Sequence, residues 1–191
     1  NINRPTLQRI NSQLKYQLPK KYAIIFIGAS CDSKKWNIAK FTRAANYLNS
    51  KYDLDIVLCG SSDDYERANQ FEHSYEGKLF NLVGKTSLLE LSTVASHADL
   101  ILSNDTMLPH LAVSLMTPNI FVIYNGSHYG RFVPYPKEIC ENHHVIYHPY
   151  IEKDLYNYKI LSNNYGYESD LYIDEISFTI VKDKIDSVLT K

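Results

Sequence analysis

Short apolar runs alternate along this chain with longer stretches that are apolar on one face only. The runs cover about residues 22–27, 55–59, 79–83, 100–102 and 120–124, and a last short one covers 145–148. Fully apolar runs of this length are typical of buried strands, and helical stretches between such strands are typical of parallel sheets. The pattern therefore predicts an α/β protein with a doubly wound parallel sheet.

The stretches between the runs have apolar residues at helical spacing. The predicted helices run from about Trp36 to Ser50, up to about Ser74, onward from Ser87, from about Pro109 to Leu115 and from about Asp174 to Leu189. Their expected core faces are Phe41, Ala44, Ala45 and Leu48 in the first, Leu88, Leu91, Val94 and Ala95 in the third, and Ile176, Ile180, Ile185 and Val188 in the last. Ser87 and Glu90 have the spacing of a capping box.

Three parts of the chain differ in character. We expect residues 1–18 to be a linker or lead-in, in which Leu7, Ile10 and Leu14 recur at helical spacing. Residues 19–150 carry the strand and helix repeats and form the predicted sheet domain. Residues 151–191 form a tyrosine-rich tail with a C-terminal helix, and residues 150–172 show little periodicity. The chain begins at Asn1 without Met, which we expect of a piece of a longer protein.

Composition limits the function classes. A chain of 191 residues has room for one domain with a full core. The formal net charge is -1, so overall charge gives no support to a nucleic-acid partner, and the sixteen tyrosines are too scattered to predict a base-stacking platform. No apolar run approaches the roughly 20 residues that span a bilayer.

The three cysteines, Cys31, Cys59 and Cys140, are too far apart for a C-x-x-C metal site. An odd number of scattered cysteines fits a reduced cytosolic compartment best. We expect Cys59 to be a packing residue inside a strand. Cys31 has no base near it in sequence and is expected to be inert.

Four loops follow predicted strands and precede predicted helices: 28–35, 60–64, 84–86 and 103–110. In a parallel sheet these loops meet at the carboxyl edge, where ligands bind. Each contains a small residue that lets a ligand approach the backbone, and helix N-termini favour anions. Together they predict a phosphate and ribose site.

Several side chains in these loops are candidate ligands. Lys34 and Lys35 can offset phosphate charge, Ser30 and Thr86 can donate hydrogen bonds, and Asp63 or Asp64 can accept from a ribose hydroxyl. The alternative readings remain open: a lysine pair before a helix is usually a solvated surface feature, and first-turn acids usually complement the helix dipole.

The loop after the fourth strand contains Asn104, Asp105, Thr106 and His110. For Thr106 an N-cap role is favoured over a ligand role, since a side-chain oxygen there accepts a free backbone N–H. His110 lies one helical turn beyond Thr106 and is equally well read as a site residue or a packing residue. Neither a Walker sequence nor G-x-G-x-x-G is present, so a dinucleotide site is not expected.

The segments GASCDSKKW at 28–36, CGS at 59–61, GKTSL at 84–88 and SNDTMLPHLA at 103–112 together resemble the carboxyl-terminal half of glycosyltransferase family 9, the heptosyltransferase-like enzymes. The resemblance runs from about Tyr22 to Tyr124. It implies a GT-B architecture, in which two Rossmann-like domains face each other across a cleft and the second holds most of the nucleotide-sugar donor. The order and spacing of the segments are jointly more specific than any one of them.

The resemblance also implies an activity. Enzymes of this family are metal-independent, need no cofactor and invert the anomeric centre. Many transfer heptose from ADP-heptose to a saccharide or glycolipid acceptor, the lipopolysaccharide inner core. The implied location is the cytoplasm, at the inner face of the inner membrane, with peripheral membrane association.

Individual site residues follow from the matching motifs. The resemblance implies that Lys35 contacts the donor phosphate, Ser30 lies in the phosphate-binding loop and Asp64 falls near the acidic ribose contact. Asp105, Thr106 and His110 match the family signature D-[ST]-G-x-x-H, whose Asp helps to bind the sugar and whose helix amides face the pyrophosphate.

Two departures matter. Met107 stands where the family usually has Gly, which narrows the backbone approach to the donor. The family's catalytic Asp lies in an amino-terminal domain that has no counterpart here, so this chain is expected to lack a catalytic base and to be inactive alone. The last helix is then expected to cross back toward that absent domain.

Two hypotheses follow. The first is the donor-binding domain of an inverting heptosyltransferase, with a nucleotide-sugar donor, a saccharide acceptor and the absent domain as partners. The second is a non-catalytic nucleotide-sugar-binding or regulatory module with the same fold, which Met107 and the tyrosine-rich tail favour. A sugar-nucleotide epimerase ranks lower, because no redox-cofactor glycine pattern is present.

Overall fold

The structure is a computed structural model that describes residues 16–190. Its strands are β1 (Tyr22–Phe26), β2 (Asp55–Cys59), β3 (Leu79–Asn81), β4 (Leu100–Asn104), β5 (Ile120–Tyr124) and β6 (His143–Tyr147). Its α-helices are α1 (Ile38–Tyr52), α2 (Tyr65–Ser74), α3 (Leu88–Ser96), α4 (Met107–Ser114), α5 (Pro149–Glu152), α6 (Tyr158–Tyr165) and α7 (Phe178–Leu189). Short 3-10 turns η1 (Asp32–Lys34), η2 (Ser62–Asp64) and η3 (Ile173–Glu175) precede α1, α2 and α7. Leu7, Ile10 and Leu14 lie outside the described residues.

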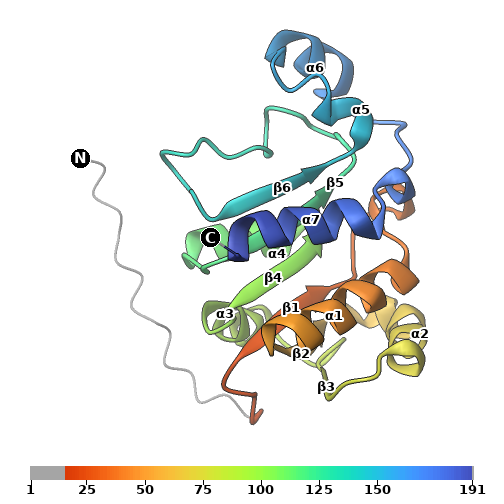
Figure 1. Cartoon of the computed structure of the whole chain (residues 1–191), viewed down its shortest axis with the longest axis vertical. Coiled ribbons are helices and arrows are strands. Elements are labelled where there is room, and N and C mark those ends of the chain that lie inside the picture. Colours follow the sequence, from red (N-terminus) through yellow and green to blue (C-terminus); the bar gives the residue numbers. More distant parts are fainter. Residues whose placement is uncertain (1–15, 191) are drawn as a thin grey trace.

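The strands form one sheet in the order β3-β2-β1-β4-β5-β6, and every neighbouring pair is parallel (Figure 1). The chain builds outward from β1 to β3, returns to the centre at β4 and builds outward again to β6. The doubly wound prediction is therefore confirmed. In such sheets the ligand crevice lies where the direction reverses, beyond the ends of β1 and β4.

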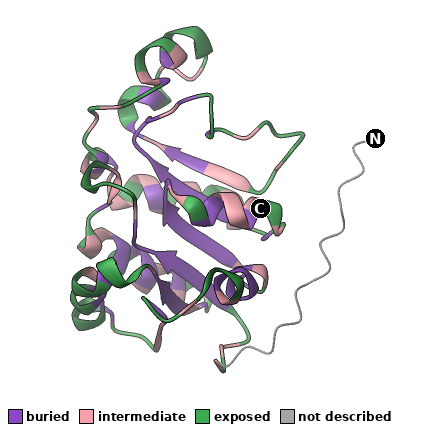
Figure 2. Cartoon of the chain, turned by 180° about the vertical axis from the view of Figure 1, so that it is seen from behind, coloured by how far each residue is buried: buried purple, intermediate pink, exposed green. Residues whose placement is uncertain are grey.

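Helices cover both faces of the sheet. One buried cluster joins inward residues of the strands to α1, α2 and α7, and a second joins the alternate strand residues to α3 and α4. The central strands are buried along their whole length, and the exposed residues lie on the helices and loops around them (Figure 2). Burial on both faces explains why the strands are apolar throughout rather than alternating.

The predicted face of α1 is confirmed, because its four members are fully buried. The predicted face of α3 is wrong at Leu88, which is 62% exposed, because the helix begins at that residue and Leu88 belongs to its first turn. The Ser87–Glu90 capping box is present as predicted. The helix predicted from Asp174 begins only at Phe178, after η3.

Sequence periodicity missed α5 and α6, which are short and pack on a small separate cluster around Tyr124 and Tyr129. In Figure 1 these two helices stand at the upper end of the molecule, beyond the main sheet layer. α7 instead shares the main core through Val181 and Ile185. The predicted boundary between residues 150 and 151 stays a prediction.

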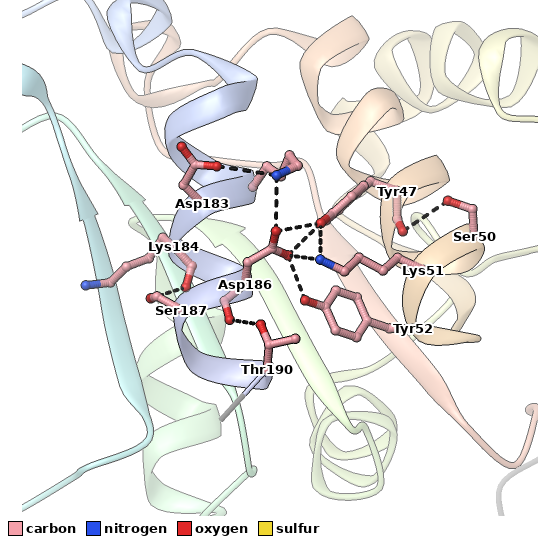
Figure 3. A network of polar contacts seen from close by, with 10 residues as sticks. Tyr47, Ser50, Lys51, Tyr52, Asp183, Lys184, Asp186, Ser187 and Thr190 are labelled. Carbon is pink, nitrogen blue, oxygen red and sulfur yellow. Dashed lines mark hydrogen bonds and ion pairs between the residues drawn. The ribbon is translucent and has the colours of Figure 1, made fainter.

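A polar network fastens α7 to α1 (Figure 3). The Asp186 carboxylate accepts hydrogen bonds from the hydroxyls of Tyr47 at 2.6 Å and Tyr52 at 2.7 Å. It also pairs with the ammonium groups of Lys51 at 3.0 Å and Lys182 at 3.1 Å. Partial burial alone raises the pKa of Asp186, but these four hydrogen bonds outweigh it and hold that pKa well below its usual range.

Candidate functional site

All the strands are parallel, so the loops that carry the predicted ligands leave the same edge of the sheet. Backbone hydrogen bonds tie these loops together: the Ile27 amide donates to the Cys59 carbonyl at 3.3 Å, and the Gly84 amide donates to the Gly60 carbonyl at 3.0 Å. The predicted ligands therefore share one rim.

Asn104, the last residue of β4, holds the two central loops in place. Its side chain is fully buried, accepts from the Trp36 amide at 3.0 Å and donates to the carbonyls of Ile27 and Gly28 at 3.1 and 3.2 Å. Buried side-chain amides are nearly always hydrogen-bonded, and the Asn104 amide makes all three of these bonds with the loop after β1. Asn104 thus shapes the loop rather than facing a ligand.

Asp105 lies between two basic groups. Its Oδ2 is 3.4 Å from the Lys34 ammonium, and its Oδ1 is 3.9 Å from Nε2 of His110. The Lys34 and Asp105 side chains are both largely buried, so their attraction is screened less than that of a surface pair. Lys34, Asp105 and His110 form a polar cluster at the point where the strand order reverses.

Lys35, the predicted phosphate ligand, belongs to the same rim loop but pairs with Asp32. Its ammonium donates to Oδ1 of Asp32 at 2.9 Å on the surface of the same loop. Lys34 is the lysine that reaches Asp105, because η1 turns the two adjacent side chains in different directions. The phosphate role of Lys35 stays a prediction.

The N-terminus of α4 opens on this cluster. Thr106 occupies the N-cap position as predicted, but its side chain makes no capping hydrogen bond, so the expected capping contact is wrong. Pro109 stands in the first turn, where its missing N–H is no loss, and the amides of Met107 and Leu108 are free of intrahelical partners by position. The Met107 side chain is 46% exposed at this helix end.

Asp64 is buried at the end of the loop after β2. Its Oδ2 accepts from the amide of Ser61 at 2.8 Å and from the Ser61 hydroxyl at 2.9 Å. A Cβ atom on Gly28 would collide with this carboxylate, so that glycine lets the loops after β1 and β2 approach. Asp64 therefore lies in the first turn, as the helix-dipole alternative expects, and also closes a capping box with Ser61 that sequence reasoning did not predict; its ribose role stays a prediction.

Ser30 and Thr86 lie in the loops after β1 and β3, where Ser30 is exposed and Thr86 is half-buried. Their ligand roles also stay predictions. Gly84 in the second of these loops has φ +66°, a left-handed conformation that glycine adopts without strain.

Sequence reasoning missed two neighbours of this cluster. The buried Asn125, directly after β5, donates to the Ser33 carbonyl at 3.4 Å and so joins the loops after β1 and β5. The hydroxyl of Tyr135 lies 2.9 Å from Nδ1 of His110. Burial is the largest cause that raises the pKa of Tyr135. The position of Asn125 just beyond a predicted strand was a usable signal, whereas no spacing links Tyr135 to His110.

Among residues 16–190, no group of three or more His, Cys, Asp or Glu side chains is placed to hold a metal ion. Within that range, no helix is both long and apolar enough to cross a bilayer. Hollows of about 560 and 660 Å³ lie along β6 and α7, and the second is also lined by Tyr135.

Residues 2–154, which are most of the chain, match the model of the family described as "Glycosyltransferase family 9 (heptosyltransferase)". This chain belongs to glycosyltransferase family 9. The family resemblance seen in the loop motifs is therefore confirmed, and the loops just described are those that carry the motifs.

Named relatives of the family agree. The chain is 25% identical to lipopolysaccharide heptosyltransferase 3 of Escherichia coli (strain K12) over 122 residues, which is 63% of this chain and 35% of that protein. The fold matches E. coli ADP-heptose lps heptosyltransferase II with a TM-score of 0.68 and 21% identity, covering 90% of this chain and 47% of the other. It also matches a family 9 glycosyl transferase from Veillonella parvula DSM 2008 with a TM-score of 0.66 and 22% identity, covering 89% and 46%. The chain thus spans half or less of the length of these relatives.

Proposed function

We propose that this chain is the donor-binding half of an inverting, metal-independent glycosyltransferase. The donor is a nucleoside-diphosphate sugar, ADP-heptose, and the acceptor is a lipopolysaccharide core saccharide. The reaction takes place in the cytoplasm at the inner face of the membrane. The other half of the enzyme completes the cleft, and this chain by itself has no turnover.

One observation carries the proposal: a lysine, a carboxylate and a free helix N-terminus meet where the sheet reverses direction. Lys34 and the α4 amides supply positive charge, and Asp105 supplies an acceptor for sugar hydroxyls. Helix N-termini and lysines are the usual partners of diphosphates. Family membership and the structural likeness to an E. coli heptosyltransferase II support the same reading.

The ligands follow one another along the rim in the order of the strands. Thr86 and Asp64 follow β3 and β2, Ser30 and Lys34 follow β1, and Asp105 and His110 follow β4. A nucleotide sugar laid along this rim would place its ribose near Asp64, its diphosphate near Lys34 and its sugar near Asp105. This is the order of groups in the donor molecule.

In the proposed reaction an acceptor hydroxyl attacks the anomeric carbon and the nucleoside diphosphate leaves. A carboxylate base in the other half takes the proton of the hydroxyl. Negative charge grows on the leaving diphosphate, and Lys34 with the amides of Met107 and Leu108 stabilises it. Asp105 and His110 hold the sugar in line for the attack.

Calorimetry with ADP and with ADP-heptose on this chain tests the proposal. We expect both to bind and Lys34→Ala to weaken both by about tenfold, because a charge-assisted contact to the diphosphate is lost. Lys182→Ala serves as a matched control for the loss of one positive charge. Lys182 is a surface residue of α7 that pairs with Asp186 and does not belong to the loops of the rim. Absence of ADP binding to the unaltered chain would contradict the proposal.

Met107 favours a second candidate, a module that binds nucleotide sugars without transferring them. Its exposed side chain stands at the first position of α4, where the family has Gly and the backbone must approach the donor. If Met107 hinders the close approach of the sugar, Met107→Gly should strengthen ADP-heptose binding while leaving ADP binding unchanged. Equal affinities of the two proteins for ADP-heptose would favour the enzyme.

A further inference from the structure

A pocket of about 530 Å³ lies beside the loop that follows β5. Its walls include Arg131, Phe132, Pro134, Tyr135, Ile139 and Tyr158. The side chains of Phe132, Ile139 and Tyr158 are largely exposed. Three aromatic rings, one cation and two tyrosine hydroxyls thus surround an open pocket that none of the predicted donor ligands lines.

The pocket is held in shape by both of its sides. Gly130 has φ +80° and lies so close to the Tyr158 hydroxyl that any side chain at 130 would collide with it. The Gly130 amide donates to the Val133 carbonyl at 2.8 Å and curls the loop. The ring of Tyr158, from α6, also packs on the buried Tyr129 at a centroid distance of 5.7 Å. The α5–α6 segment, which sequence periodicity missed, therefore supplies one wall.

The opposite wall is shared with the candidate donor site. Tyr135 meets Nδ1 of His110 through its hydroxyl at 2.9 Å, and the ring of Phe132 lies edge-on to the His110 ring at 6.0 Å. The other ring nitrogen of His110 faces Asp105 at 3.9 Å. One histidine therefore separates the pocket from the carboxylate that is proposed to hold the donor sugar.

The strand order says what comes next along the rim. The proposed donor runs from the ends of β3 and β2, across β1, to the end of β4, with its sugar last. The next strand is β5, and the loop after β5 forms the pocket. A molecule in the pocket would therefore lie on the sugar side of the donor and away from its base.

We propose that this pocket binds a sugar ring of the saccharide acceptor, an inference that rests on the proposed function. The apolar C–H faces of a pyranose pack on aromatic rings, and its hydroxyls need nearby donors and acceptors. Phe132 and Tyr158 supply the faces, and Arg131 with the Tyr158 hydroxyl supplies polar partners. Rigid tyrosines are suited to this because they lose little side-chain entropy on binding.

Saturation-transfer NMR with methyl β-D-glucopyranoside tests this inference on the full chain. This probe presents axial C–H bonds on both faces of its ring. We expect magnetisation transfer to its ring protons, with and without saturating ADP. We expect Phe132→Ala and Tyr158→Ala to weaken probe binding by about tenfold. Tyr156→Ala is the matched control, because Tyr156 is an exposed tyrosine of the same segment that does not line the pocket.

The inference would be overturned if no magnetisation reached the probe, or if Tyr156→Ala weakened probe binding as much as the two pocket variants. It would also be overturned if ADP-heptose displaced the probe competitively, because the two would then share the donor position. Thermal unfolding of each variant separates loss of binding from loss of folding. ADP calorimetry on the same samples is independent of the pocket. If ADP binds and the sugar does not, the acceptor pocket fails and the proposed function stands; if ADP does not bind, the proposed function itself fails.

Discussion

The ammonium group of Lys34 lies 3.4 Å from Oδ2 of Asp105, although 71 positions separate the two residues in the chain. The contact joins the loop after β1 to the start of α4, across the point where the strand order reverses. Under the proposed function, this pair sets the local charge that the donor diphosphate meets. Lys35, the residue next to Lys34 in the sequence, pairs with Asp32 instead.

The two lysines give a direct comparison. We expect Lys34→Ala to weaken ADP binding by about tenfold and Lys35→Ala by less than about threefold, because only Lys34 reaches the rim cluster. Lys34→Ala also leaves the Asp105 charge uncompensated beside the incoming phosphates. Calorimetry at low and at physiological salt measures both effects. A larger loss in Lys35→Ala would restore the assignment that the family resemblance implies.

Asn104 is expected to matter more for folding than its small size suggests. Asn104→Ala removes three buried hydrogen bonds and leaves the Trp36 amide and the Ile27 carbonyl without that partner, so we expect the free energy of unfolding to fall by about 2–4 kcal/mol. Urea denaturation measures the change. Asn119→Ala is the control, since that half-buried amide makes a single bond to the Asp99 carbonyl at 2.9 Å. Similar losses in both variants would contradict the organising role of Asn104.

Asp64 allows its two candidate roles to be separated. Ser61→Ala and Asp64→Ala both break the capping box and should each lower the free energy of unfolding by about 1 kcal/mol. If Asp64 also contacts ribose, only Asp64→Ala should weaken ADP binding beyond the loss in Ser61→Ala. Paired urea melts and ADP titrations measure both properties. Equal ADP affinities in the two variants would remove the ribose role.

The Asp186 network predicts a dependence of stability on pH. Since the pKa of Asp186 is lowered in the folded state, its contribution is present above the ordinary carboxyl pKa of about 4 and is lost as the pH falls below that value. The group is near the surface, so we expect Asp186→Asn to cost about 1 kcal/mol at pH 7. Unfolding at pH 7 and pH 3 measures this.

The expected signature is a difference between wild type and Asp186→Asn that shrinks at pH 3. The control variant is Asp183→Asn, because Asp183 is mainly exposed and pairs with Lys182 at 3.4 Å. A constant difference across this pH range would show that the charge of Asp186 does not stabilise the contact between α1 and α7.

Much of the fold was predictable because the central strands are buried on both faces. Runs such as residues 22–27 and 120–124 contain little besides β-branched and aromatic residues, and this alone located the sheet. α5 and α6 were not predictable, since α5 has four residues and α6 buries only Leu161, too few positions to set a helical period. Leu88 shows the opposite error. It has the spacing of the buried face of α3, but it lies in the first turn of that helix and is exposed.

The site was predictable as a set of loops but not as a set of contacts. Parallel strands place their following loops at one edge, which is why position alone predicted that Asp64 and Asp105 lie on the same rim. The orientation of adjacent side chains depends on the turn between them, so sequence did not separate Lys34 from Lys35. Tyr135 reaches His110 from the loop after β5, and only the path of that loop brings them together.

Trp36 connects the loop after β1 to three other parts of the chain. Its amide donates to Asn104, its carbonyl accepts from Arg67 at 2.7 Å, and its indole donates to the Ile176 carbonyl at 2.7 Å. It is also the sole tryptophan of the sequence and is fully buried directly after the loop at 28–35. The chain therefore carries one intrinsic fluorophore, placed directly after the loop at 28–35 with its indole bonded to the Ile176 carbonyl, and we expect a nucleotide that binds at the rim to change its emission in stopped-flow fluorescence without any added label.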